Sequence, residues 1–185
     1  IVEQLDSIRK QTRPVDEVII VDDCSKDDTV NILRSYIDSF GLHTWRIYQH
    51  TENKGFIQTF SEALLLTAGD VIILSDHDDA WMPRKAELIE NSFAANPQIL
   101  ALATSFVEMD ENGKTRPAKK YRGKANNGLI RRKIKRGALT KIELKDCAVY
   151  NISPGCTCAL SGMLRSRYQE TLNERDLPHD WKINI

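Results

Sequence analysis

The stretch VIIVDDCSKDDT, from Val18 to Thr29, contains the pattern that decides the fold. Four β-branched apolar residues end in two adjacent aspartates, and a cluster of Ser, Asp and Thr follows. A continuous β-branched run is typical of a strand that is covered on both faces, as in a parallel sheet. Adjacent carboxylates raise each other's pKa unless a cation or hydrogen-bond donors compensate them. The stretch therefore predicts a buried strand with a ligand-facing end.

Strand and helix signals alternate along the rest of the chain. Further strands are predicted at 45–48, 71–74 and 100–107. Helices are predicted to end near Gln11, Gly41 and Gly69, and another to run from Pro83 to about Ala95. This alternation predicts an α/β domain with a mainly parallel sheet and helices on both faces.

A second acidic cluster, Asp76-His-Asp-Asp79, directly follows the strand predicted at 71–74. Ligands bind beyond the carboxyl ends of parallel strands, and Mg²⁺ or Mn²⁺ prefers oxygen ligands. The side chains of Asp76 and Asp78 would point to the same side of an extended segment. Each cluster alone has a second interpretation, because Asp22 and Asp23 could cap a helix and Asp76–Asp79 could form a solvated turn. Together they favour a shared site for a metal and its ligand.

Composition excludes several other classes of protein. The 185 residues fit one domain, and 26 basic residues balance 26 acidic ones, so the charge gives no indication of nucleic-acid binding. No apolar run reaches the roughly 18 residues of a membrane span. The four cysteines lack zinc-finger spacing and are predicted to be reduced thiols (Cys24, Cys147, Cys156 and Cys158). These features predict a cytoplasmic protein.

The segment 114–136 has eleven Lys and Arg residues and no acidic residue. It is interpreted either as a solvated insertion within a single domain 1–185, or as a surface for an acceptor pyrophosphate or anionic lipid. The second interpretation would place the protein peripherally at the inner face of the cell membrane. Tyr121 is the one aromatic residue in the segment, which disfavours nucleic acid as the partner. Because both chain ends lack cap or stop signals, we interpret the domain as truncated at both ends.

Three blocks of sequence, in this order, resemble the family 2 glycosyltransferases of the GT-A fold: VIIVDDCSKDDT, ENKGFIQTFSEALLLTAGDVIILSDHDDAW and PHDW. The resemblance extends from residue 1 to about residue 181. It implies an inverting, metal-dependent transfer of one sugar from a nucleotide-diphosphate sugar to a saccharide or lipid-linked acceptor. The Asp-x-Asp-Asp-x-Trp variant is most similar to bacterial enzymes that add rhamnose or galactose to surface polysaccharides. The resemblance also implies that the family's first strand precedes this chain.

The resemblance assigns roles to the donor-binding residues. Asp22 and Asp23 match the pair that contacts the base and ribose, and Asn53 and Gly55 match the loop along the nucleotide. The segment from Asp76 to Asp78 matches the DxD motif, in which Mg²⁺ or Mn²⁺ bridges the protein to the diphosphate, so both aspartates are candidate metal ligands.

Residues near the C-terminus match the acceptor side of the family. Asp180 matches the catalytic base of inverting members, although alone it would be read as a helix cap. Gly155 and Thr157 match a loop below the acceptor site, although an ordinary Pro-Gly turn fits the same letters. His77 and His179 are interpreted as structural or solvent-facing rather than as metal ligands.

Three rival functions are distinguishable by sequence. A receiver domain would not need the second acidic cluster, and a phosphohydrolase would need a Thr or Lys partner for its nucleophile that Ser75–Ala80 does not supply. A truncated nucleotide-sugar-binding module without catalysis remains the alternative to the enzyme.

Overall fold

The computed structural model describes residues 1–116, 137–142 and 155–165. Its N-terminal part contains α1 (Val2–Arg9), β1 (Val18–Asp22), α2 (Thr29–Phe40) and β2 (Trp45–Gln49). The two strands pair in parallel, with Val18 opposite Trp45 and Asp22 opposite Gln49. The strands predicted at 18–21 and 45–48 are confirmed, and their carboxyl ends lie side by side.

A second sheet forms from more distant parts of the chain. It consists of β3 (Val71–Ile73), β4 (Ala101–Ala103) and β7 (Cys158–Ser161), and the helices α3 (Phe56–Leu66) and α4 (Lys85–Ala95) precede β3 and β4 in the chain. β7 lies between β3 and β4 and runs antiparallel to both, so β3 and β4 run in the same direction. Short 3₁₀ helices flank β7 at Gly155–Thr157 (η1) and Gly162–Leu164 (η2), and β5 (Glu108–Met109) pairs with β6 (Thr115–Arg116) in a separate hairpin.

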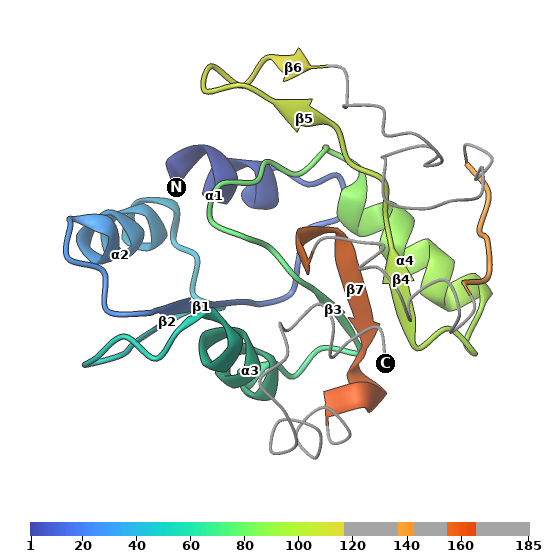
Figure 1. The fold of residues 1–185 in the computed structure, drawn as a ribbon, viewed down its shortest axis with the longest axis horizontal. Coiled ribbons are helices and arrows are strands. Elements are labelled where there is room, and N and C mark those ends of the chain that lie inside the picture. Colours follow the sequence, from blue (N-terminus) through green and yellow to red (C-terminus); the bar gives the residue numbers. More distant parts are fainter. Residues whose placement is uncertain (117–136, 143–154, 166–185) are drawn as a thin grey trace.

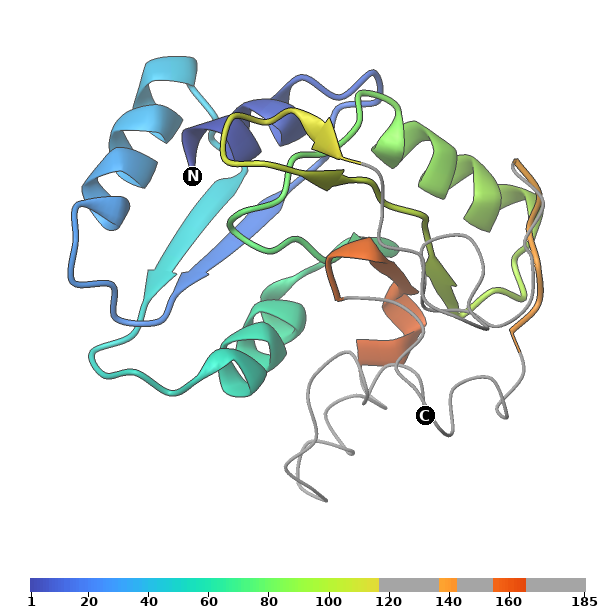
Figure 2. The same ribbon diagram turned by 45° about the horizontal axis from the view of Figure 1, so that its top comes forward.

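Helices cover both faces of the strands, which confirms the predicted α/β class. In Figures 1 and 2, α1 and α4 lie on one side of the strands and α3 lies on the other. Within the described residues, no helix is long and apolar enough to cross a membrane.

Helix boundaries follow local chemistry. α2 ends at Gly41, whose φ of 60° lies in the left-handed region that glycine adopts without steric penalty. α4 begins at Lys85, two residues after Pro83. The prediction that Pro83 lies in the first turn of this helix is therefore wrong. The strand predicted at 100–107 is shorter than expected and covers only β4.

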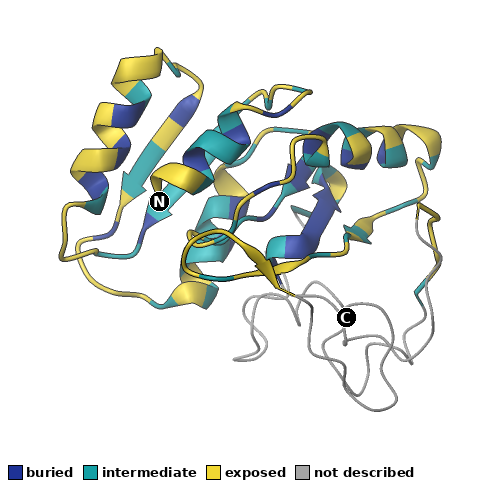
Figure 3. Ribbon diagram, turned by 90° about the horizontal axis from the view of Figure 1, so that it is seen from above, coloured by how far each residue is buried: buried dark blue, intermediate teal, exposed yellow. Residues whose placement is uncertain are grey.

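Three clusters of buried apolar residues form the core, and Figure 3 colours the buried positions dark blue along the ribbon. The first joins α1 to α2 and β2 through Leu5, Leu33 and Trp45, and it also contains Trp81. Trp81 follows the acidic cluster Asp76–Asp79 in the chain, and it is 8% exposed. Burial of a large apolar side chain stabilises the fold by about 2 kcal/mol, so this residue anchors the acidic segment to the core.

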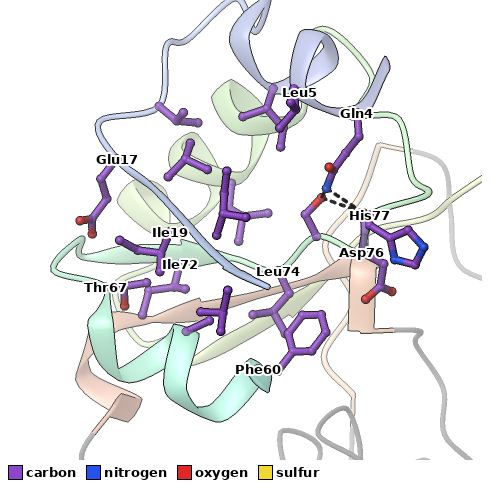
Figure 4. A pocket seen from close by; sticks show the side chains of 18 of the residues that line it. Gln4, Leu5, Glu17, Ile19, Phe60, Thr67, Ile72, Leu74, Asp76 and His77 are labelled. Atoms are coloured by element: carbon purple, nitrogen blue, oxygen red, sulfur yellow. Dashed lines mark hydrogen bonds between the residues drawn. The ribbon is translucent and has the colours of Figure 1, made fainter. Parts of the chain in front are cut away.

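A cavity of about 750 Å³ separates the two sheets. Its wall includes residues 18–22 along β1 and residues 71–74 along and just beyond β3. Figure 4 shows Ile19, Ile72 and Leu74 in its apolar part and Asp76 at one end. That a further strand precedes residue 1 stays a prediction.

Candidate functional site

Asp22 stabilises the turn that leaves β1. Its side chain is buried, and its Oδ2 accepts a hydrogen bond from the backbone N–H of Ser25 at 3.1 Å. In the same turn, Asp27 Oδ1 accepts a hydrogen bond from the N–H of Thr29 at 3.1 Å. Cys24 lies between them with φ of 65°, a conformation that costs a non-glycine residue about 1 kcal/mol. The carboxylate of Asp22 therefore holds this turn and does not cap α2, which begins at Thr29.

Asp23 holds the loop at Asn53 and Gly55, which was predicted to belong to the same site. Its Oδ1 accepts a hydrogen bond from the N–H of Lys54 and its Oδ2 one from the N–H of Gly55, each at 2.8 Å. The Asn53 side chain donates to the backbone carbonyl of Asp23 at 3.3 Å. Gly55 has φ of 82°, which a side chain would strain. The structure thus brings together Asp23, Asn53 and Gly55.

His50 and Glu62 extend this group, and sequence reasoning missed both. His50 directly follows β2, and its Nδ1 lies 2.9 Å from Asp23 Oδ1. Its Nε2 lies 2.7 Å from Glu62 Oε2 on α3. The signal that could have found His50 is its position at the end of the second parallel strand, the same sheet edge as Asp23. We call Asp23, His50 and Glu62 the histidine clamp.

The clamp shifts the pKa of each of its members. The hydrogen bond with Asp23 raises the pKa of His50 above its usual 6.5, against the opposing effect of burial. Burial raises the pKa of Asp23, but the bonds from His50 and from the loop N–H groups lower it by more. Bonds from Gln58, Lys54 and His50 lower the pKa of Glu62 to about 2. All three shifts favour the charged forms.

The second acidic cluster folds as a tight turn. The N–H of Asp79 donates to the carbonyl of Asp76 at 3.4 Å, which places residues three apart on the same side of the backbone. Ligand atoms of Asp76, Asp79 and Cys156 all lie within 4.8 Å of one another. Asp78 is exposed and lies outside this trio. The prediction of an extended segment that places Asp78 beside Asp76 is therefore wrong for this turn, which places Asp79 beside Asp76 instead.

The flanks of this turn are fixed by α1 and the core. Gln4 Nε2 donates to Ser75 Oγ at 3.0 Å and to the carbonyl of Asp76 at 2.8 Å (Figure 4). The indole N–H of Trp81 donates to the same Ser75 Oγ at 3.1 Å. Ser7 Oγ accepts a hydrogen bond from the backbone N–H of Trp81 at 2.9 Å. The acidic side chains therefore project from a rigid support.

Cys156 connects the turn to the segment before β7. Burial, and then a hydrogen bond with Asp79, raise the pKa of the Cys156 thiol to about 12. A thiol with that pKa is protonated at neutral pH, so it donates to Asp79 rather than acting as an anionic ligand. Lys85 donates to the carbonyl of Cys156 at 2.8 Å and lies 4.5 Å from the centre of the Trp81 ring. The oxygen atoms of the turn suit Mg²⁺ or Mn²⁺ better than a softer metal.

The other predicted residues fall in different places. Gly155 and Thr157 are buried in η1, and the carbonyl of Thr157 accepts hydrogen bonds from the N–H and hydroxyl of Thr104. Asp180, His179 and most of the basic segment 114–136 lie outside the described residues. The two groups that the structure does describe, at Asp23 and at Asp76, both border the cavity between the sheets.

Comparison with known proteins gives a family for this arrangement. The sequence profile described as Glycosyl transferase family 2 matches residues 1–171. The chain is similar to an uncharacterized glycosyltransferase of Haemophilus influenzae, with 35% identity over 95 residues, which are 51% of this chain and 30% of the relative. It is also similar to the putative teichuronic acid biosynthesis glycosyltransferase TuaG of Bacillus subtilis, with 39% identity over 83 residues, or 44% of this chain and 31% of that protein.

Solved structures show the same fold. The mannosyltransferase PcManGT of Pyrobaculum calidifontis, in complex with GDP-Man and Mn²⁺, superposes with a TM-score of 0.61 at 19% identity. The superposition covers 98% of this chain and 46% of the mannosyltransferase. The chain matches less than a third of the length of the two curated relatives.

Proposed function

Because the chain belongs to glycosyl transferase family 2, we propose that it is part of an inverting, metal-dependent glycosyltransferase. It transfers one sugar from a nucleotide-diphosphate sugar to a saccharide or lipid-linked acceptor in surface polysaccharide synthesis. The observation that carries this proposal is that the Asp23 group and the acidic turn border one cavity. The bound GDP-Man and Mn²⁺ of the solved neighbour and the name of the teichuronic acid relative support it.

On the donor side, the nucleoside lies against Asp22, Asp23 and the loop at Asn53 and Gly55. Asp23 keeps acceptor capacity beyond its three hydrogen bonds, because an ionised carboxylate has about four lone-pair positions. The site therefore accepts a hydrogen bond from a base or a ribose hydroxyl.

Asp76 and Asp78 hold the cation, with Asp79 as a third carboxylate within reach of Asp76. Asp78 is suited to this role because it is exposed, whereas the carboxylate of Asp79 accepts a hydrogen bond from the Cys156 thiol. A bound Mg²⁺ or Mn²⁺ supplies positive charge that stabilises the departing diphosphate. Without a cation the neighbouring carboxylates repel each other.

On the acceptor side, Asp180 removes the proton of the attacking hydroxyl, and a single displacement inverts the anomeric centre. The loop at Gly155 and Thr157 lies beneath the acceptor. The basic segment 114–136 contacts an anionic lipid surface, at which each Lys or Arg contributes about 1 kcal/mol of binding. This contact places the enzyme peripherally at the inner face of the membrane.

Calorimetry tests the donor site. UDP, dTDP and GDP are titrated with and without Mn²⁺ into the wild type, the Asp78→Asn variant and an Asp38→Asn control on the exposed face of α2. We expect one nucleotide to bind in a Mn²⁺-dependent manner to the wild type and the control, and the dependence to be lost in Asp78→Asn. Equal binding by Asp78→Asn would remove that residue from the metal site. Binding of a nucleotide sugar without sugar transfer to any acceptor would favour the alternative, a binding module without catalysis.

A further inference from the structure

The histidine clamp joins three elements that are distant in sequence. Asp23 follows β1, His50 follows β2 and Glu62 lies on α3. The imidazole is 7% exposed and lies between two carboxylates, at 2.9 Å from Asp23 and 2.7 Å from Glu62. Among the residues that the structure describes, Lys54 is a further charged group at this point, and its Nζ lies 3.0 Å from Glu62 Oε1.

The chemistry of imidazole makes this arrangement depend on protonation. Both neighbours of the ring are ionised carboxylates, which only accept hydrogen bonds. A doubly protonated ring donates to Asp23 and Glu62 at once. A neutral ring has one N–H, so one of the two contacts would place a nitrogen lone pair against a carboxylate oxygen.

The clamp is linked directly to the nucleotide loop. The same Asp23 oxygen that contacts His50 accepts the N–H of Lys54, and the second Asp23 oxygen accepts the N–H of Gly55. A shift of the Asp23 carboxylate would therefore move both loop N–H groups. The buried ring has little room to turn toward water instead.

We propose that His50 is a positioning residue that holds Asp23 and the loop 53–55 in the ligand-binding arrangement only while its ring is doubly protonated. The consequence for nucleotide affinity rests on the proposed function. The raised pKa of His50 sets the direction of the effect. A group whose pKa is raised in the folded state stabilises that state fully below its ordinary pKa, which is 6.5 for histidine. This stabilisation is lost as pH rises through the folded-state pKa. The site should thus weaken as pH rises above 6.5 and through the folded-state pKa of His50.

A nuclear magnetic resonance titration of the ligand-free chain tests the clamp itself. Among the four histidines, the resonances of His50 and His43 are assigned with His50→Gln and with His43→Gln, which replaces an exposed histidine. We expect His50 to titrate above 6.5 and the Gly55 amide shift to follow the same midpoint. In a Glu62→Gln variant both midpoints should move down together. A Gly55 amide that does not follow His50 would overturn the proposal.

A binding titration from about pH 6 to about pH 8.5 in Mg²⁺ tests the effect on the ligand, with the nucleotide that calorimetry identifies. We expect affinity to fall roughly tenfold toward high pH, the size of one lost charge-assisted hydrogen bond. His43→Gln should keep this profile, and His50→Gln should be weak and flat. A flat wild-type profile would contradict the inference. If no nucleotide binds at any pH, the proposed function fails, and the resonance titration still decides the role of His50.

Discussion

The two polar groups that border the cavity are held in opposite ways. Around Asp23, hydrogen bonds from His50 and from two loop N–H groups converge on the carboxylate itself. At the acidic turn, the hydrogen bonds from Gln4 and Trp81 fix the backbone and Ser75, and Asp78 remains exposed. The first group is pre-organised by the protein, whereas in the second the protein supplies a rigid turn and crowds acidic groups on it.

Because of this difference, substitutions in the two groups should have different effects on fold stability and on ligand binding. Removing a carboxylate that satisfies buried donors leaves those donors unpaired, and the fold loses stability. Removing one of several crowded carboxylates relieves repulsion, so the fold loses little while a cation loses a ligand. Variants in the two groups should therefore affect different measurements.

The largest effect is expected at Asp76, which belongs both to the DxD motif and to the trio with Asp79 and Cys156. Asp76→Asn should lower metal-dependent nucleotide binding by roughly 100-fold, because the substitution removes an anionic oxygen ligand. The unfolding free energy should change by less than about 1 kcal/mol. Calorimetry and urea denaturation of the same sample measure the two quantities. A large loss of stability with normal metal dependence would contradict this prediction, because it would mean that Asp76 holds the fold rather than the cation.

The next effect is expected at Asp23. Asp23→Asn should lower the unfolding free energy by about 2 kcal/mol, because an amide cannot accept every bond that the carboxylate receives from His50, Lys54 and Gly55. Urea denaturation with an unchanged slope checks this value, and Asp38→Asn serves as the exposed control. A variant as stable as the control would show that the loop is held by other contacts.

A smaller effect on the unfolding free energy is expected when the pH is lowered. The pKa of Glu62 is lowered to about 2, so its contribution to stability is present above its ordinary value of 4.5 and is lost as pH falls toward 2. The difference in unfolding free energy between the wild type and Glu62→Gln should therefore shrink over this range. Urea denaturation at several pH values measures it. A difference that is constant with pH would show that Glu62 ionises alike in the folded and unfolded chain.

The smallest effect is expected at Lys54. Its ion pair with Glu62 is partly exposed, and pairs of this kind contribute about 0–1 kcal/mol. Lys54→Met should therefore lower stability by less than Asp23→Asn does, and salt should reduce the difference further. Thermal denaturation at low and high ionic strength provides the measurement. A loss equal to that of Asp23→Asn would mean that the Lys54 side chain, and not its backbone N–H, holds the loop.

The sequence predicted what depends on local pattern. The β-branched run before Asp22 and the glycine at position 41 each mark an element boundary that the structure confirms. The meeting of Asp23 with Gly55 was also predictable, because the family resemblance placed both at the donor nucleotide.

The sequence did not predict contacts that depend on distant segments or on the backbone path. β7 lies between β3 and β4 although it follows them by more than fifty residues in the chain, and no sequence periodicity predicts such a pairing. His50 and Glu62 are single polar residues whose partners become neighbours only after β1, β2 and α3 have packed. At Asp76–Asp79 the spacing of acids is compatible with an extended segment and with a turn, and the packing of Trp81 against α1 favours the turn.

The division of the strands into two sheets has a consequence for strand pairing at the cavity. Within the described residues, β1 pairs with β2 alone and β3 pairs with β7 alone, so each has a second backbone edge along the cavity. Strand edges of this kind are where extended chains add, whether from the same protein or from another copy. The same two edges that frame the cavity are therefore places at which an extended segment can pair, and such a segment would lie along the cavity wall.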